Sequence, residues 1–159
     1  MKIQKIDYFR YVAIYHFGGF YFDLDILGSR PLNDLCDKSC IFPIDMHIKE
    51  DMCDQERYMF YCKNNTKYLL GQYAFAAQPK HPFIKKIIEA INQNINKFIA
   101  DFDTEFGKTH EFVYKSTGPD LVTDVYLNYN DNDDITILYH REGQYFGNYA
   151  KHNFYGSWK

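Results

Sequence analysis

The sequence predicts one α/β domain in which helices and strands alternate along the chain and pack in layers. The chain has 159 residues, and 46% of them are hydrophobic, which is enough apolar surface for one core but not for two. Hydrophobic periods typical of helices alternate with periods typical of strands, and no internal repeat is visible. We therefore expect a single domain over residues 1–159.

The first predicted element is a helix over residues 3–17. Its apolar side chains recur at steps of three and four residues, at Ile6, Phe9, Ala13 and Phe17. Gly18 follows directly, at the position where a glycine in the left-handed conformation commonly ends a helix. We expect the helix to end at the glycine pair, residues 18 and 19.

A strand is predicted next, over residues 20–26, because apolar and polar side chains alternate there. The face of this strand that we expect to meet the core carries Phe20, Phe22, Leu24 and Ile26. The other face carries Tyr21, Asp23 and Asp25. The alternation thus predicts two carboxylates and one phenol on a common surface.

The middle of the chain gives weaker signals. We expect short strands over residues 40–44 and 57–62, on either side of a polar segment at 45–56. Four scattered cysteines do not form the dense framework of a small secreted module, so reduced thiols are expected at Cys36, Cys40, Cys53 and Cys62. A zinc site is the minor alternative, because the cysteines form no Cys-x-x-Cys pair and only His47 lies nearby.

Two helices and a strand are predicted in the second half. A long amphipathic helix starts at Pro82, and its apolar positions are Ile84, Ile87, Ile88, Ile91, Ile95, Phe98 and Ile99. Another helix opens at residues 117–120, where Pro119 suits the first helical position and Asp120 suits the positive end of the helix. The apolar stripe of that helix consists of Val122, Val125, Tyr126 and Tyr129. Residues 135–139 are predicted to form a strand.

Charge and hydropathy disfavour several classes of partner. There are 18 basic and 21 acidic side chains, a net charge of −3, and no dense block of either sign, so we expect no nucleic-acid partner. The longest apolar stretch, residues 11–22, is shorter than the roughly 20 residues that a membrane span needs. The first residues lack the apolar core of a secretory signal. The default expectation for localisation is therefore cytoplasmic.

The sequence Asp23-Leu24-Asp25 is the sharpest chemical signal in the chain. Two carboxylates at the end of an apolar strand supply the oxygen ligands that Mg²⁺ or Mn²⁺ prefers. Asp7 and Arg10 lie three residues apart and therefore share one face of the preceding helix. The alternative for each pair is structural: two acids on a solvent-exposed strand face, and an ordinary surface ion pair.

Residues 7–25 resemble the DXD-containing sugar-binding region of glycosyltransferase family 32. The resemblance lies in an acid and an arginine three apart on a helix, a glycine pair, and then Tyr-x-Asp-x-Asp. Three later segments fit the same family: residues 72–82, Thr117-Gly118-Pro119 with Thr123, and the tail at 152–158. The family includes initiating α-1,6-mannosyltransferases, sphingolipid mannosyltransferases and capsular sugar transferases. It implies a GT-A-type, Rossmann-like fold.

The resemblance also implies an activity and a set of site residues. The expected reaction is metal-dependent transfer of a hexose from a UDP- or GDP-sugar to a hydroxyl of a glycan, lipid or protein, with retention of configuration. Asp25 is the implied ligand of Mn²⁺ or Mg²⁺, helped by Asp23 and His152. The residues implied to act on the donor are Asp7, Arg10, Tyr21, Asp23, Ser157 and Trp158. For the tail positions, a frayed C-terminus is the alternative.

The chain departs from the family at its start, because family members carry several tens of residues before the Asp-x-x-Arg helix. We therefore expect an N-terminally truncated form whose parallel sheet has an unpaired edge, completed by another chain or by a homo-oligomer. A missing N-terminal anchor would imply a Golgi or membrane-associated protein. A second hypothesis is a non-catalytic remnant that binds a sugar or a partner. A third is a haloacid-dehalogenase-type phosphatase, although Leu27 stands where that pattern has Thr or Val.

Overall fold

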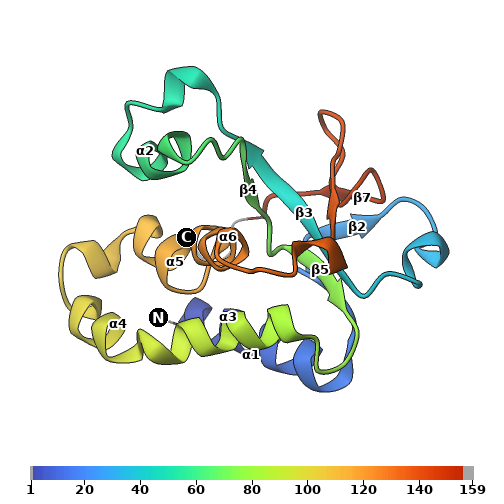
Figure 1. Cartoon of the computed structure of the whole chain (residues 1–159), viewed down its shortest axis with the longest axis horizontal. Helices are drawn as coiled ribbons and strands as arrows, with labels where there is room; N and C mark the ends of the chain where they lie inside the picture. Colours follow the sequence, from blue (N-terminus) through green and yellow to red (C-terminus); the bar gives the residue numbers. More distant parts are fainter. Residues whose placement is uncertain (1, 156–159) are drawn as a thin grey trace.

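The structure is a computed structural model that describes residues 2–155. It is an α/β protein, as predicted, with helices on one side of a central sheet and a small second sheet beyond it (Figure 1). In chain order the helices and strands are α1 Lys2–Phe17, β1 Gly19–Phe22, β2 Ile26–Gly28, β3 Cys40–His47, α2 Glu56–Lys63, β4 Tyr68–Leu70, β5 Ala74–Ala77, α3 Pro82–Gln93, α4 Ile95–Phe102, α5 His110–Ser116, α6 Pro119–Leu127, β6 Ile135–Leu138 and β7 Ala150–His152.

The central sheet is mostly antiparallel, which corrects the expectation of a parallel sheet. β1 pairs with β5, and β5 and β4 both pair with β3, all in antiparallel fashion. Within residues 2–155 the one parallel pair joins β3 to β6, with Cys40 opposite Ile135. β2 and β7 form a separate antiparallel ribbon in which Ile26 faces His152.

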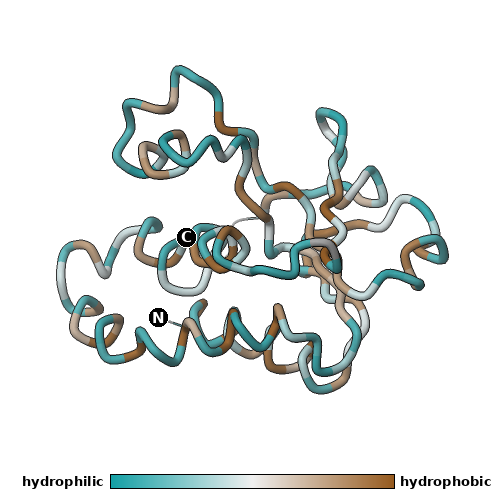
Figure 2. The backbone as a smooth tube through the Cα atoms, in the orientation of Figure 1, coloured by the Kyte–Doolittle hydropathy of each residue, from teal (hydrophilic) through white to brown (hydrophobic). Residues whose placement is uncertain are grey.

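Strand alternation separates two apolar cores. Phe42 on β3 and Phe75 on β5 face the core that α1, α3 and α6 cover. Their neighbours in sequence, Ile41 before Phe42 and Ala76 after Phe75, point to the opposite face of the sheet. They belong to a second core, which includes Ala150 of β7. Figure 2 shows brown, apolar segments along the strands of the central sheet. The sheet is buried on both faces by these two cores.

Helix α1 confirms the predicted helix, but the predicted apolar stripe is wrong. The buried residues are Asp7, Arg10, Tyr11 and Ile14, whereas Ile6, Phe9 and Phe17 are exposed. The helix has apolar side chains on two sides, so periodicity alone could not choose between them. Gly18 ends the helix as predicted: its φ is +67°, and its amide donates to the carbonyl oxygen of Ile14.

The strand predicted over residues 20–26 is also corrected. β1 ends at Phe22, and the chain turns at Asp23 because the amide of Ile26 donates back to its carbonyl oxygen. The chain then enters the second sheet as β2, and Leu24 lies fully exposed at the turn rather than in the core. Asp23 and Asp25 are therefore turn residues. An alternating pattern cannot show that a chain leaves one sheet for another.

Residues 57–62, predicted as a strand, form helix α2. Tyr58 and Tyr61 are its buried positions, and their spacing of three residues fits a helix. Cys53 and Cys62 form a disulfide, so the expectation of reduced thiols holds for Cys36 and Cys40 and is wrong for the other two. β3 also extends to His47, three residues beyond the predicted strand. Residues 48–67 thus form a lobe that projects beside β4 (Figure 1).

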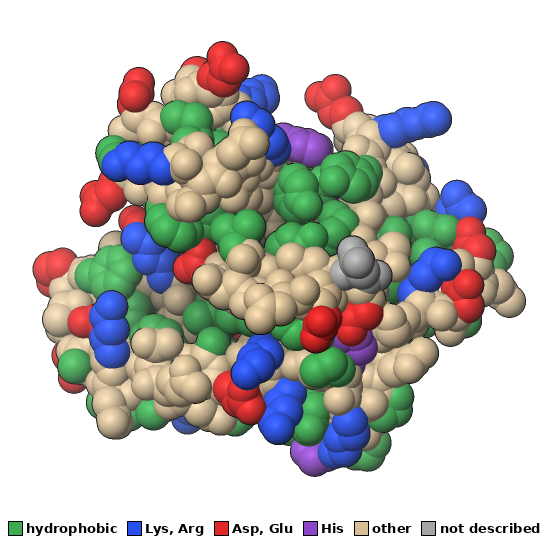
Figure 3. Space-filling view, viewed as in Figure 1, with side chains coloured by type: hydrophobic (Ala, Val, Ile, Leu, Met, Phe, Trp, Pro, Cys, Tyr) green, Lys and Arg blue, Asp and Glu red, His purple; other side chains and the backbone are tan. Residues whose placement is uncertain are grey.

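The second half follows the prediction more closely. The long helix from Pro82 is divided at Asn94 into α3 and α4, and α6 starts at Pro119 as predicted. β6 ends one residue before the predicted strand, and α5 was not predicted. None of the helices formed by residues 2–155 is long and apolar enough to cross a membrane. On the face shown in Figure 3, basic and acidic side chains are interspersed.

Candidate functional site

Arg10 connects helix α1 to the turn that follows β1. Its Nη1 lies 3.2 Å from Oδ1 of Asp23, and its guanidinium lies over the ring of Tyr21, 4.7 Å from the ring centroid. The hydroxyl of Tyr21 donates to the same oxygen of Asp23 at 2.7 Å. β1 places Tyr21 on the side of the sheet that faces α1, so these three side chains meet as the sequence predicted.

Asp7 is held from two directions. Nη2 of Arg10 lies 2.8 Å from its Oδ1, and the hydroxyl of Thr117 donates to its Oδ2 at 2.7 Å. Asp7 is 1% exposed and Arg10 is 3% exposed, so the pair is not the surface ion pair considered as an alternative. The desolvation of a buried ion pair is offset only when its remaining polar atoms have partners. Thr117 supplies such a partner from the loop between α5 and α6.

Gln72 joins the same cluster from the loop between β4 and β5. Its backbone carbonyl accepts a hydrogen bond from Nη1 of Arg10 at 3.1 Å, and its side-chain oxygen accepts one from the hydroxyl of Tyr11. That hydroxyl also lies 2.9 Å from the carbonyl oxygen of Thr117. The three segments that contain Asp7, Gln72 and Thr117 therefore converge, although they are far apart in sequence.

One donor in this cluster has no partner. Nε of Arg10 is buried, and no hydrogen bond reaches it from the described part of the chain. A buried donor without a partner is costly, and such groups occur where a ligand or an ordered water completes the site. The atom can therefore donate to a polar ligand once the groups that cover Arg10 move.

Burial dominates the electrostatics of this cluster. It raises the pKa of Asp7 above its ordinary value, while the charge of Arg10 and the hydrogen bond from Thr117 oppose that rise. Burial also raises the pKa of Asp23, again opposed by Arg10 and by the hydroxyl of Tyr21. Arg10 thus favours the ionised form of both carboxylates.

Asp25 and His152 meet at the start of the β2–β7 ribbon. Oδ2 of Asp25 lies 3.7 Å from Nδ1 of His152 and accepts a hydrogen bond from the amide of Tyr155 at 3.2 Å. The amide of Asn153 donates to the backbone carbonyl of Asp25 at 2.9 Å. Burial lowers the pKa of His152, although the nearby Asp25 and Asp23 raise it, so the neutral imidazole is favoured. Nδ1 of His152 accepts a hydrogen bond from the amide of Phe154 at 2.9 Å, so this nitrogen can act as a metal ligand only when that bond is broken.

Sequence comparison finds a family match around the turn. Residues 1–42 match the family described as "Glycosyltransferase sugar-binding region containing DXD motif". Over these residues the chain is similar to DXD-containing glycosyltransferases. Asp23 and Asp25 lie within the matched residues, and we call residues 23–25 the DXD turn. The resemblance found in residues 7–25 is thereby confirmed.

Two individual proteins are similar to the chain. Inositol phosphoceramide mannosyltransferase 1 of Schizosaccharomyces pombe is 29% identical over 105 residues, which cover 66% of this chain and 27% of that protein. The chain therefore spans about a quarter of the length of this relative. The solved structure of the PaToxG glycosyltransferase is 17% identical, with a TM-score of 0.49, over 84% of this chain and 39% of that one.

The DXD turn offers donors that suit a hard divalent cation. Within residues 2–155 no three His, Cys, Asp or Glu side chains converge into a preformed metal cluster. The side chains of Asp25 and His152 approach each other. Asp23 is the other acid of the turn, and Arg10 and Tyr21 both contact its Oδ1. Mg²⁺ sites commonly use one or two carboxylates and take their other ligands from water and phosphate. The residues present therefore fit such an ion.

Several contributors were not predicted. Gln72 lies in a segment that resembles the family, but its contact with Arg10 runs through a backbone carbonyl, which leaves no mark in the sequence. Tyr11 lies four residues after Asp7, so helical spacing could have placed it on the same face. The rings of Tyr73 and Tyr145 flank His152, with centroids 5.4 Å away in each case. The predicted residues Ser157 and Trp158 lie outside the described residues.

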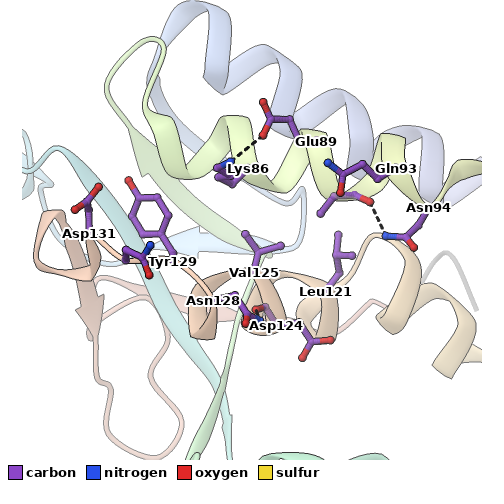
Figure 4. Close-up of a pocket in the computed structure, with 12 residues that line it drawn as sticks. Lys86, Glu89, Gln93, Asn94, Leu121, Asp124, Val125, Asn128, Tyr129 and Asp131 are labelled. Atoms are coloured by element: carbon purple, nitrogen blue, oxygen red, sulfur yellow. Dashed lines mark hydrogen bonds and ion pairs between the residues drawn. The ribbon is translucent and has the colours of Figure 1, made fainter.

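A cleft elsewhere on the molecule is separate from this cluster. It has a volume of about 550 Å³ and lies between α3 and α6 (Figure 4). Its lining includes Lys86, Glu89, Asp124 and Tyr129, and none of the predicted site residues. The candidate site is thus defined by Arg10 and the DXD turn and not by this cleft.

Proposed function

We propose that the chain is a glycosyltransferase that moves a hexose from a UDP- or GDP-sugar to a hydroxyl of a glycan, lipid or protein, with retention of configuration. The observation that carries the proposal is the double contact of Arg10, which joins Asp7 on α1 to Asp23 in the DXD turn. A sugar-binding region that matches a glycosyltransferase family supports it. The unpartnered Nε of Arg10 supplies a donor for a sugar hydroxyl.

The proposed cofactor is Mn²⁺ or Mg²⁺, held by Asp25 with Asp23 and His152 beside it. Such an ion neutralises the charge that develops on a diphosphate leaving group. In this proposal the chain's own residues orient the donor: Arg10 and Asp7 bind hydroxyl groups of the sugar. Tyr21 orients Asp23 through a hydrogen bond from its hydroxyl, and it orients Arg10 through contact with its ring.

The name of the S. pombe relative favours one version of the reaction. That protein is an inositol phosphoceramide mannosyltransferase, so mannose as the hexose and an inositol-bearing lipid as the acceptor are the first pair to test. Because the chain spans only about a quarter of the length of that relative, mannose and the lipid acceptor are part of this proposal.

The experiment measures donor binding and its dependence on metal. The melting temperature of the purified chain is followed with a panel of UDP- and GDP-sugars, with Mn²⁺ or with EDTA, because a ligand that binds the folded state raises it. We expect a rise for one donor only when metal is present, and release of free hexose or glycosylated acceptor on longer incubation. Asp25→Asn is expected to abolish the rise, and Asp51→Asn, an exposed control, is not.

One observation favours the alternative of a non-catalytic binding module. Asp7 and Arg10 are almost fully covered, so a donor sugar reaches both only if neighbouring groups such as the side chain of Gln72 move. A module that binds sugar would show a melting shift without any turnover of donor. Equal donor affinity in the wild type and in Asp25→Asn would contradict the metal assignment.

A further inference from the structure

The last described residues of the chain bond back to the DXD turn. The amide of Asn153 continues the β2–β7 ribbon, because it donates to the backbone carbonyl of Asp25 at 2.9 Å. The next two amides bond to side chains instead. The amide of Phe154 donates to Nδ1 of His152 at 2.9 Å, and the amide of Tyr155 donates to Oδ2 of Asp25 at 3.2 Å. We call Phe154 and Tyr155 the latch.

The two atoms that accept these bonds are also suitably spaced to share a cation. Nδ1 of His152 lies 3.7 Å from Oδ2 of Asp25. A metal ion binds nitrogen or oxygen at about 2.0–2.2 Å, so one ion can touch both atoms at this separation. Nδ1 of a neutral imidazole has one lone pair, and the amide of Phe154 already uses it. The amide of Tyr155 also directs the positive end of its N–H at Oδ2. The latch and a shared cation therefore exclude each other.

Few contacts hold the latch in place. Phe154 is 63% exposed and Tyr155 is 70% exposed. The ring of Phe154 stacks on the imidazole of His152, with centroids 4.0 Å apart and planes 12° apart. The backbone of Phe154 has a φ of +52°, which is strained for a residue other than glycine. A segment with exposed hydrogen bonds and a strained residue opens at a small cost in free energy. A ligand that competes for the two acceptor atoms can therefore displace it.

We propose that the latch closes the candidate metal site and that a divalent cation opens it. The cation takes Nδ1 of His152 and Oδ2 of Asp25, the two amides of the latch bond to water, and the ribbon stays paired up to Asn153. The closed latch lowers the apparent affinity for the cation, because only molecules with an open latch bind it. By linkage, the cation weakens the latch by the same factor. The proposal rests on the cation proposed above for Asp25 and His152.

The first test is the affinity for Mn²⁺, measured from the electron paramagnetic resonance signal of the free ion. Phe154→Pro removes one amide of the latch and cannot adopt a positive φ, and it leaves Asp25 and His152 unchanged. We expect it to bind Mn²⁺ roughly threefold to tenfold more tightly, the contribution of one hydrogen bond. Phe154→Gly keeps the amide and tolerates the positive φ, so its gain should be smaller. Leu24→Ala, at a fully exposed side chain of the same turn, is the control and should not change the affinity.

The second test follows the latch itself by nuclear magnetic resonance during a titration with Mg²⁺, which is not paramagnetic. We expect the amide signals of Phe154 and Tyr155 to shift toward the positions of an unstructured peptide, and to saturate at the same Mg²⁺ concentration as the signal of Asp25. The amide of Ser29, which donates to the carbonyl oxygen of Tyr149 at 2.8 Å within the same part of the fold, is the internal control and should not move.

The variants change exposed side chains, and their melting temperatures without metal check that they fold. Cation binding that leaves the latch amides in place would overturn the proposal, as would equal affinity in the wild type and in Phe154→Pro. Equal gains in the proline and glycine variants would overturn it too, because the amide would then not be the competitor. These three results leave the metal assignment intact. No binding of either cation, or unchanged binding in Asp25→Asn, would overturn the latch and the metal assignment together.

Discussion

The hydroxyl of Thr117 donates a 2.7 Å hydrogen bond to the carboxylate of Asp7, across 110 positions of sequence. The bond ties the loop between α5 and α6 to the first helix and places both beside Arg10. It brings together two of the segments in which the sequence resembles the glycosyltransferase family.

Thr117→Val is expected to destabilise the fold by about 1–3 kcal/mol, because it leaves a buried carboxylate with one partner fewer. The hydrogen bond lowers the pKa of Asp7, so its loss raises that pKa further. The destabilisation should therefore be larger at a pH where Asp7 is ionised than at a pH low enough to protonate it. Urea unfolding at two pH values measures this. Thr66→Val is the control, because the hydroxyl of Thr66 has no hydrogen-bond partner.

Gly18→Ala should be the most damaging of three glycine substitutions. Gly18 has a φ of +67°, and a Cβ there would lie 2.6 Å from Cδ of Pro79. Strain of about 1–2 kcal/mol and overpacking of about 1–3 kcal/mol then add together. Gly19→Ala carries only the strain, at φ +92°, and Gly28→Ala meets no atom within 4 Å. Equal unfolding free energies for all three variants would contradict this account of the helix end.

Removal of the Cys53–Cys62 disulfide is expected to loosen the lobe at residues 48–67. The two cysteines are nine residues apart, and closure of such a loop stabilises a protein by about 2–3 kcal/mol in the chain-entropy view. Alkylation of the denatured, unreduced chain should modify Cys36 and Cys40 only, which mass spectrometry can count. Cys36→Ser is the control for stability, and modification of all four cysteines would rule out the disulfide.

Asp45→Asn is expected to raise stability at neutral pH. Burial raises the pKa of Asp45 to about 6, although Arg57 opposes the rise. The folded state therefore takes up a proton that the unfolded state has already lost, and stability falls as pH rises from about 4 to 6. The variant should lack this fall and gain up to about 2 kcal/mol at pH 7. Thermal unfolding across pH, with Asp51→Asn as the control, measures the difference.

The ends of the helices could be predicted from the sequence, but the course of the strands could not. Gly18 and Pro119 mark helix boundaries through local backbone chemistry, and both were predicted. The turn that ends β1 was not predicted, because it depends on a hydrogen bond from Asp23 to Tyr73 and on another within the turn itself. At Tyr58 and Tyr61 the spacing did indicate a helix, and the aromatic, strand-like composition outweighed it.

The residues of the candidate site could be predicted from the sequence, but their arrangement in space could not. Asp7 and Arg10 meet through helical spacing and Tyr21 faces them from β1, whereas Asp23 joins them from the turn after that strand. The burial of Asp7 and Arg10 was not expected, since Gln72 covers them from a loop whose position depends on the whole sheet. The disulfide was likewise hidden, because pairing among four cysteines depends on distance in space.

The pairing of β2 with β7 has a consequence for biosynthesis. Asp25 is translated well before the segment that holds it, around His152. A ribosome-bound chain stalled before residue 150 carries both acids of the DXD turn without the ribbon that shapes them. The acids therefore acquire their final geometry only after residues 150–152 have left the ribosome.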